Sequence, residues 1–367
     1  VNKFQNKSNF RRQIKVKNTL QFLTNASKIF RNSIDTNIIA ITGSCGKTTL
    51  KELLGYVLSK IRKVSISPKS YNNKFGVPLS LFNIKQNDEY GILEVGMDKK
   101  GEIDSLSKII KPNIGVITNI NYAHVKNFKN IKQIALAKSE IIDNIKPNGF
   151  VVLNADDSFF RLHKKIAKAK NIKVVSFGIK SSKSDIKLVE VKPLGKKFKI
   201  IISLNNKNEH FFISYNFQNY IYNILCALAI ISIDINISKL PKNIFLNFEI
   251  PRGRGDHSVI KIDNKKINLI DQSYNSNPLS LKSAINNYDK IDTKKSNKFL
   301  IIGDMLELGS HSKKLHQSIV PIINQTKIDK VFVKGKMVSL IFKNISKVKR
   351  GRILVNNSQI IELIKKD

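Results

Sequence analysis

The chain has 367 residues, of which 41% are hydrophobic and 8% aromatic, and its formal net charge is +37. This length and composition fit two or three globular domains, and no apolar run approaches the roughly 18–20 residues that a membrane-spanning helix needs. The charge would suit a nucleic-acid-binding protein, but the lysines are scattered and no zinc-ligand spacing, basic arm or RNP-type aromatic motif accompanies them, so we expect no nucleic-acid partner.

Residues 1–36 are basic and predict a helix around residues 19–30, in a segment too short to form a domain. The opening stretch is polar and lacks the apolar core of a signal peptide. The two cysteines, Cys45 and Cys226, lie far apart and indicate no disulfide framework. We therefore expect a cytoplasmic protein.

Residues 37–49, NIIAITGSCGKTT, predict a strand that runs directly into a phosphate-binding loop and then a helix. Glycines let the backbone curl so that its N–H groups face an anion, Lys47 can reach the outer phosphates, and the hydroxyl of Thr48 is placed for Mg²⁺. The loop is shorter than the general Walker pattern, which would have glycine where Ile41 stands. The alternative is a glycine-rich turn with a surface lysine. The expected nucleotide-binding residues are Gly43, Ser44, Cys45, Gly46, Lys47, Thr48 and Thr49.

Apolar strands alternate with amphipathic helices from residue 37 to about residue 236, which predicts an α/β fold with a mostly parallel sheet. Residues 186–215 predict antiparallel strands, and residues 220–233 an apolar helix. The expected parallel strands are residues 37–42, 91–95, 114–118, 150–154 and 173–177.

Residues 249–256, EIPRGRGD, are rich in Gly, Pro and charge and are interpreted as a domain junction. Beyond it, strands that alternate with helices predict a smaller, Rossmann-like α/β domain. Its expected strands are residues 266–271, 298–303 and 330–334. The expected domains are thus an N-terminal segment 1–36, a central nucleotide-binding domain 37–249 and a C-terminal domain 250–367.

Polar residues follow strand ends in the central part, where open parallel sheets collect their ligands. Glu94 ends an otherwise apolar strand, where a carboxylate could coordinate a cation; a salt-bridged strand-end glutamate is the alternative. His124 is interpreted as a second metal ligand or a phosphate contact, although a lone histidine is more often a packing or surface residue. Lys138 lies on the following helix, where spacing alone would make it an exposed lysine.

Three polar loops are further candidates for binding. Asn72 and Asn73 precede a glycine and a proline, so either turn chemistry or ligand binding would explain them. In the C-terminal part, loops 271–278 (DQSYNSNP) and 303–309 (GDMLELG) each follow a strand and open a helix, and their density of Asp, Asn, Ser and Tyr favours binding. The substrate-binding candidates are Asn72, Asn73, Tyr274, Asn275 and Asn277.

Together these motifs resemble the Mur ligase family, ATP-dependent enzymes that form amide bonds in peptidoglycan precursor synthesis. The resemblance runs from about residue 16 to residue 365 through the blocks ITGSCGKTT, SYNNKFGVPLSL, LEVGMDKKGEID, ITNINYAHVKNFKNIKQIALAKSEI, DQSYNSNPLSLKSAI and IGDMLELGSHSKKLH. The last two are similar to blocks of the member that joins D-alanyl-D-alanine to UDP-N-acetylmuramoyl-tripeptide. The resemblance therefore implies these two substrates, and we expect a monomer without membrane insertion.

The resemblance also implies roles for single residues. Lys47 and Thr48 would hold the ATP phosphates and a first Mg²⁺, and Glu94 and His124 would serve a second Mg²⁺. Lys138 matches the lysine that is carbamylated in the family, which turns a cation into a metal-binding carbamate.

Two further positions concern the nucleotide. Asn223 falls where the family contacts adenine, and Arg254 matches the junction arginine that reaches the phosphates on domain closure. The implied catalytic residues are Lys47, His124, Lys138 and Arg254, and the implied metal ligands are Thr48, Glu94, His124 and Lys138. The implied reaction activates the tripeptide carboxylate as an acyl phosphate, which the amine of D-alanyl-D-alanine then attacks.

The chain departs from the family pattern in several places. The helix motif Gly-x-His-Asn reads Phe217, Asn219 and Tyr220 here, and a commonly acidic position is Gln272, both where adenosine contacts are expected. Only residues 16–31 resemble the N-terminal uridine-nucleotide domain, so we expect residues 1–36 to be its remnant and the chain to be a fragment at both ends.

Two alternatives stay open. Another Mur-type ligase or a folylpolyglutamate synthetase would share the phosphate loop but should lack the paired C-terminal blocks. A nucleic-acid-binding P-loop ATPase, the more distant alternative, would explain the charge and predicts nucleic-acid affinity that falls steeply with salt.

Overall fold

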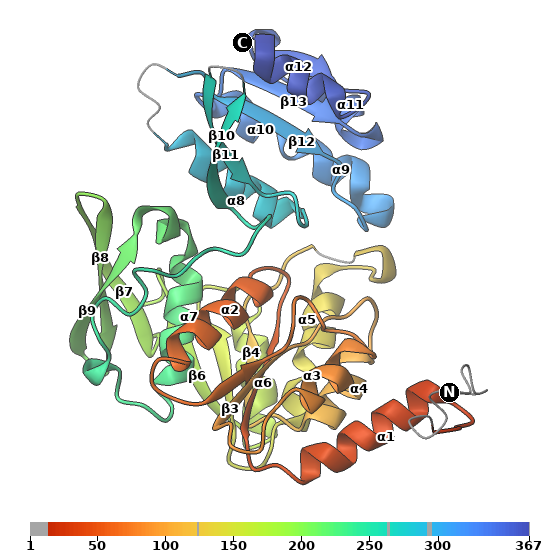
Figure 1. The fold of residues 1–367 in the computed structure, drawn as a ribbon, viewed down its shortest axis with the longest axis vertical. Helices are drawn as coiled ribbons and strands as arrows, with labels where there is room; N and C mark the ends of the chain where they lie inside the picture. The colour runs from red at the N-terminus through yellow and green to blue at the C-terminus, as the bar shows by residue number, and fades with distance from the viewer. Residues whose placement is uncertain (1–13, 123–124, 263–264, 292–295, 367) are drawn as a thin grey trace. The chain divides into compact units, whose positions relative to one another are not determined.

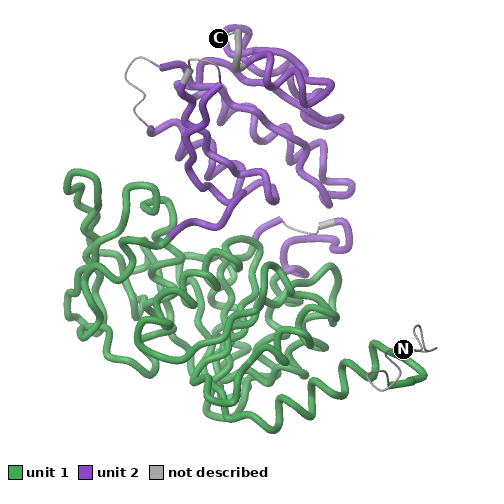
Figure 2. Tube along the Cα trace, in the orientation of Figure 1, with its two compact units in different colours: residues 1–120, 135–248 green, residues 121–134, 249–367 purple. Residues whose placement is uncertain are grey.

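The computed structural model describes residues 14–122, 125–262, 265–291 and 296–366. The chain divides into two compact units (Figure 2): unit 1 comprises residues 1–120 and 135–248, and unit 2 comprises residues 121–134 and 249–367. Residues 121–134, which the sequence places in the central domain, thus cluster with the C-terminal part. No helix in the described ranges is long and apolar enough to cross a membrane.

Unit 1 is built on a nine-stranded sheet with the order β2-β3-β1-β4-β5-β6-β7-β8-β9. The pairs from β2 to β7 are parallel, and the pairs β7–β8 and β8–β9 are antiparallel. This arrangement confirms the predicted α/β fold with a mostly parallel sheet. The strands are β1 Asn37–Thr42, β2 Val64–Ile66, β3 Tyr90–Glu94, β4 Ile114–Ile117, β5 Phe150–Asn154, β6 Lys173–Gly178, β7 Ile186–Leu194, β8 Lys197–Leu204 and β9 Lys207–Ser214.

Helices cover both faces of this sheet (Figure 1). Because crossovers between parallel strands are right-handed, α2, which leads from β1 to β2, lies opposite the helices that lead toward β6. Accordingly α2 contacts α7, whereas α3 and α4 contact each other and α1. Burial on both faces explains why β1 is a continuous apolar run. The helices are α1 Thr19–Asn32, α2 Lys47–Leu58, α3 Gly76–Phe82, α4 Glu102–Ile110, α5 Ile131–Ser139, α6 Phe160–Ala169 and α7 Ile221–Ile231.

The position of β1 between β3 and β4 brings three loops together. In the register of the sheet, Ile41 pairs with Glu94 of β3, and Thr42 pairs with Ile117 of β4. The loops that follow these three parallel strands therefore leave from the same edge. Such a switch point is where open α/β sheets bind their ligands.

Unit 2 contains two small sheets. Strands β12 Phe299–Gly303, β13 Lys330–Lys334 and β14 Arg350–Ile353 form a parallel sheet, and β10 Asp256–Ile262 pairs antiparallel with β11 Lys265–Asp271. The predicted strand at residues 266–271 is confirmed as β11, which leads into α8. It pairs antiparallel with β10, a strand that begins at the end of the predicted junction and was not itself predicted. The helices are α8 Pro278–Asp289, α9 Ser312–Gln317, α10 Val320–Gln325, α11 Lys336–Phe342 and α12 Ser358–Lys366.

Short 3₁₀ turns complete both units. They are η2 Val125–Asn127, η3 Ile142–Asn144, η4 Tyr215–Tyr220, η5 Ile237–Lys239, η6 Gly309–His311 and η7 Lys347–Lys349. One of them belongs to an internal contact of unit 2: the N–H of Lys126 donates to the carbonyl of Glu307 at 3.1 Å, and η2 packs against η6.

Candidate functional site

The predicted phosphate loop connects β1 to the N-terminus of α2. Gly46 precedes the helix with φ 81°, a left-handed conformation that glycine adopts readily. No side chain in the described chain caps this helix, which is 12 residues long. Its first N–H groups and the positive end of its dipole are therefore available to an anion.

The carboxyl end of β4 holds the loop in place. The amide of Asn119 bonds both backbone groups of Cys45, with its Oδ1 accepting at 3.1 Å and its Nδ2 donating at 3.2 Å. The hydroxyl of Thr118 donates to the same carbonyl at 2.6 Å. Gly43 has φ +145°, and a Cβ there would lie 1.9 Å from Oγ1 of Thr118. The backbone curl thus requires glycine and is fixed before any ligand arrives.

Thr118 and Asn119 were not among the predicted site residues. Both stand in the block TNINYAH directly after a buried strand, the block in which only His124 was predicted to belong to the site. His124 itself lies outside the described residues. Thr42 was also missed: its buried hydroxyl, at the start of the phosphate loop, has no hydrogen-bond partner in the described structure. An unsatisfied buried hydroxyl is costly unless a ligand or water completes it.

Two lysines converge on one backbone carbonyl of the loop. The ammonium groups of Lys47 and Lys138 donate to the carbonyl of Gly43 at 2.9 and 3.1 Å. Lys138, on α5, is only 2% exposed, so it is not the surface lysine that spacing alone would give. Burial, and then the neighbouring charge of Lys47, hold the pKa of Lys138 well below its ordinary value. A lowered pKa favours the neutral amine, which is nucleophilic.

Glu94 faces the first turn of α2 from the end of β3. One carboxylate oxygen accepts from the hydroxyl of Thr48 at 2.6 Å, and the other from the amide of Asn72 at 2.8 Å. Glu94 is buried, and its partners in the described chain are neutral groups. The salt-bridge alternative therefore finds no support in these contacts.

The oxygens of Thr48 and Glu94 are hard donors of the type that Mg²⁺ prefers. Among the described residues, no group of three or more His, Cys, Asp or Glu is placed to hold a metal. Mg²⁺ is usually bound by one or two carboxylates together with substrate phosphates, so the donor set beside this loop fits that ion.

The other amides of unit 1 differ in what they contact. The side-chain oxygen of Asn73 accepts from the N–H groups of Phe75 and Gly76 at 3.1 and 2.9 Å, which is turn chemistry. The amide of Asn223, on α7, donates to the carbonyl of Gly46 at 3.0 Å. The structure therefore brings Asn223 to the loop and Asn72 to Glu94, whereas the oxygen of Asn73 shapes the turn before α3.

In unit 2, the junction and the loop after β11 meet. The guanidinium group of Arg254 lies over the ring of Tyr274, 4.0 Å from its centroid, and the N–H of Tyr274 donates to the carbonyl of Gly253 at 3.0 Å. The ring of Tyr274 is 55% exposed, and Asn275 is also exposed. Asn277 is buried, and its side chain accepts from the N–H of Ser280 at 3.0 Å, which caps α8.

The loop after β12 also uses its polar groups internally. The carboxylate of Asp304 accepts from the N–H groups of Met337 and Val338 at the start of α11, at distances of 2.8 to 3.2 Å. The buried ring of His316 accepts from the N–H of Met305 at 3.0 Å. These contacts fix the loop within unit 2.

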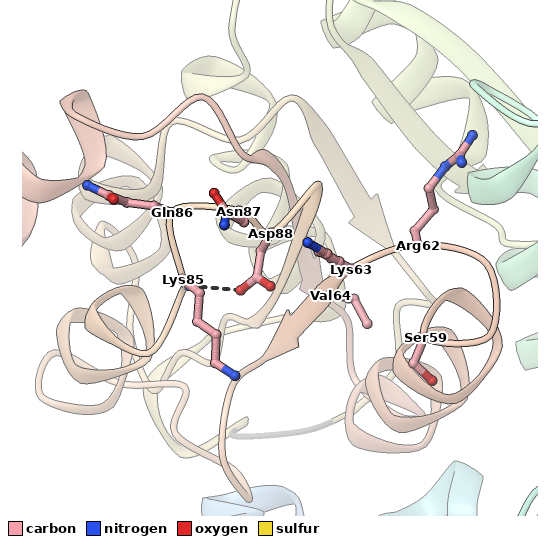
Figure 3. A pocket seen from close by; sticks show the side chains of 8 residues that line it. All are labelled: Ser59, Arg62, Lys63, Val64, Lys85, Gln86, Asn87 and Asp88. Atoms are coloured by element: carbon pink, nitrogen blue, oxygen red, sulfur yellow. Dashed lines mark hydrogen bonds between the residues drawn. The ribbon is translucent and has the colours of Figure 1, made fainter.

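A surface cavity of about 550 Å³ lies elsewhere in unit 1 (Figure 3). It sits where β2 begins and beside the loop that precedes β3, whereas the phosphate loop follows the carboxyl ends of the strands. The N–H of Lys85 donates to buried Asp88 at 2.8 Å. Its lining includes no predicted site residue; the lining residues are Ser59, Arg62, Lys63, Val64, Lys85, Gln86, Asn87 and Asp88.

Comparisons with known proteins agree with this architecture. The family model described as Mur ligase middle domain matches residues 41–231, and the model described as Mur ligase, glutamate ligase domain matches residues 258–366. The UDP-N-acetylmuramoyl-tripeptide--D-alanyl-D-alanine ligase of Rickettsia prowazekii is 34% identical over 333 residues, which cover 90% of this chain and 72% of that protein. The protein of the same name from Buchnera aphidicola subsp. Acyrthosiphon pisum is 35% identical over 356 residues, which cover 95% of this chain and 75% of that protein.

Solved structures share the fold. MurF from Acinetobacter baumannii superposes with a TM-score of 0.85 at 25% identity, covering 96% of this chain and 75% of that chain. MurF ligase from Thermotoga maritima, solved in complex with ADP, has a TM-score of 0.75 at 21% identity, covering 96% of this chain and 84% of that one.

Proposed function

The chain belongs to the Mur ligase family, and we propose that it joins D-alanyl-D-alanine to UDP-N-acetylmuramoyl-tripeptide at the expense of ATP. One observation carries this proposal: a phosphate loop, a buried lysine and a buried carboxylate meet at one sheet edge of a chain that is 34% identical to a ligase of that name. A reaction on nucleotide-linked precursors also favours a cytoplasmic location.

ATP would bind with its phosphates at the N-terminus of α2. The free N–H groups of the helix and the ammonium of Lys47 would then neutralise the phosphate oxygens. Asn223 contacts the end of the loop and would face the nucleoside, which agrees with its implied contact to adenine. The unpaired hydroxyl of Thr42 would gain a partner when the loop is filled.

Mg²⁺ would be held by Thr48 and Glu94, and it would offset the charge of the transferred phosphoryl group. Lys138 would complete the site as a carbamate: its neutral amine forms an N–C bond to CO₂ and releases a proton. This reaction would turn an amine whose charged form Lys47 repels into an anion that Lys47 attracts. His124, which lies outside the described residues, stays a proposed ligand of a second ion.

The remaining chemistry requires the protein to position its substrates more than to supply acid–base side chains, because ATP supplies the leaving group. The tripeptide carboxylate would attack the γ-phosphate to give an acyl phosphate, and the amine of D-alanyl-D-alanine would displace inorganic phosphate from it. Lys47 and, from unit 2, Arg254 would offset the charge that develops on the phosphoryl oxygens. Tyr274 would keep the guanidinium group of Arg254 oriented.

Phosphate release from ATP tests this proposal. We expect release only when UDP-N-acetylmuramoyl-tripeptide and D-alanyl-D-alanine are both present, with a stoichiometric UDP-linked pentapeptide detected by mass spectrometry. The tripeptide should be supplied with either lysine or diaminopimelate at its third position. Product formed equally well with a single amino acid in place of the dipeptide would indicate another Mur-type ligase. Release stimulated by nucleic acid would contradict the proposal.

A further inference from the structure

Helix α2 contains a second lysine, Lys51, one turn after Lys47, and this second lysine is buried. The side chain of Lys51 is 0% exposed, although it carries a charge and lies outside the phosphate loop. Burying an ammonium group is costly unless all of its donors are satisfied. A lysine is therefore retained at such a position only when its contacts offset that cost.

All three N–H donors of Lys51 have an acceptor. Its ammonium donates to the backbone carbonyls of Ser67 and Lys69, both at 2.5 Å, and pairs with the carboxylate of Glu52 at 3.0 Å. Lys69 has φ 45°, a left-handed conformation that a lysine rarely adopts. The bond to Lys51 thus stabilises an otherwise unfavourable bend in the loop between β2 and α3.

This loop positions Glu94 from two sides. The hydroxyl of Ser67 accepts from the backbone N–H of Glu94 at 3.2 Å, and the amide of Asn72 donates to its carboxylate at 2.8 Å. Asn72 is itself fixed, because its carbonyl accepts from the N–H of Gly96 at 2.8 Å. A Cβ on Gly96 would lie 2.9 Å from Asn72, so the loop is closely packed against the end of β3.

We propose that Lys51 is a positioning residue for the carboxylate of Glu94. Lys51 connects α2, which carries Thr48, to the loop that carries Ser67 and Asn72. This connection keeps the Thr48 hydroxyl and the Glu94 carboxylate at the distance that a shared divalent cation needs. The inference rests on the proposed function in so far as that function assigns Mg²⁺ to Thr48 and Glu94. Groups that orient metal ligands typically change metal affinity by about 10- to 100-fold when removed.

The test compares ATP affinity in Mg²⁺ and in EDTA by titration calorimetry. Lys51→Met keeps the length and apolar stem of the side chain but removes its charge and donors. The quantity compared is the factor by which Mg²⁺ raises ATP affinity. We expect this factor to be about tenfold or more smaller in Lys51→Met than in the unchanged protein. ATP affinity in EDTA should be nearly the same in both.

Lys298→Met is the matched control. Lys298 is also buried and donates to a backbone carbonyl, that of Asp289 at 2.8 Å, but it lies in unit 2. Both variants should melt at a lower temperature, and only Lys51→Met should lose the effect of Mg²⁺. An unchanged Mg²⁺ effect in folded Lys51→Met would overturn the inference.

A further variant covers the case in which Lys51→Met does not fold. Ser67→Ala removes only the hydroxyl that accepts from Glu94, and it should show a smaller loss in the same direction. If both Ser67→Ala and Asn72→Ala retain the full Mg²⁺ effect, the inference fails. Unchanged protein that binds ATP more tightly with Mg²⁺ but forms no peptide product would contradict the proposed reaction alone. Mg²⁺-independent ATP binding would overturn the positioning role.

Discussion

The two units contain polar loops of similar composition, but these loops differ in what their side chains do. Around the phosphate loop of unit 1, Lys138 and Glu94 are buried ionisable side chains whose described partners are neutral groups. In unit 2, Asn277 caps α8 and Asp304 caps α11, while the half-buried Arg254 lies against the exposed Tyr274. A buried ionisable side chain without an oppositely charged partner therefore indicates a site better than an abundance of polar residues does.

The largest expected effect concerns Lys47. Lys47→Ala should lower the rate of ligation by about 1,000-fold, because it removes the charge that offsets the transferred phosphoryl group. Phosphate release with both substrates measures the rate, and the circular dichroism spectrum should not change. Near-normal turnover would exclude this loop as the reaction site. The buried groups of unit 1 would then indicate a site no better than the polar loops of unit 2.

Lys138→Ala should cost about 100-fold in rate, and a short carboxylic acid such as formate or acetate should restore part of it. The cavity left by the lysine would admit an anion at the place of the proposed carbamate. Lys132, an exposed lysine on the same helix, offers the control. Lys132→Ala should keep full activity, and the added acid should not change its rate. Absence of rescue would count against a carbamate.

Arg254 tests whether unit 2 contributes to the chemistry. Arg254→Ala should lower kcat by about tenfold through the loss of a charged hydrogen bond, while the exposed neighbour Arg252→Ala should not. Tyr274→Phe keeps the ring under the guanidinium group and should retain activity, whereas Tyr274→Ala should reproduce part of the loss. Equal kcat values for Arg254→Ala and the unchanged protein would confine the site to unit 1.

Substitutions of Asn277 distinguish a role in helix capping from a role in substrate binding. Asn277→Ala should destabilise the protein by about 1 kcal/mol, because α8 loses the side chain that accepts from Ser280. Asn277→Ser should preserve most of the stability, since serine also caps helices. Thermal unfolding reports the effect, and kcat should stay unchanged. A higher KM for either substrate at normal stability would instead make Asn277 a ligand contact, as the sequence predicts.

The smallest effect is a dependence of stability on pH. The ring of His163 is buried and hydrogen-bonded to the carbonyl of Ala135 at 3.1 Å, and burial lowers its pKa. The unfolded chain therefore takes up this proton first as the pH falls below about 6.5, so stability is lost on acidification. The difference in melting temperature between the unchanged protein and His163→Gln should shrink from about pH 8 to pH 5. A constant difference would contradict a lowered pKa.

The sequence predicts local features of this fold better than contacts between distant elements. The strand, loop and helix at residues 37–58 are visible because apolar periodicity and glycines are local signals. The burial of Lys138 depends on a contact between distant parts of the chain, because its ammonium donates to the carbonyl of Gly43, 95 residues earlier. No local pattern records such a contact. Asn277 did carry a local signal: an asparagine followed by proline and, three residues on, serine is typical of a helix start. The hairpin of β10 was missed because a charged, glycine-rich stretch leads into it.

The close approach of Gly43 to Thr118 has a consequence for genetic selection. Any side chain at position 43 meets two separate obstacles, a collision with a hydroxyl and a backbone angle that L-residues rarely adopt. A second-site change such as Thr118→Gly could relieve the first but would also remove a bond that holds the loop, and it leaves the second untouched. Suppressor screens that start from a Gly43 mutant should therefore return only revertants at that codon.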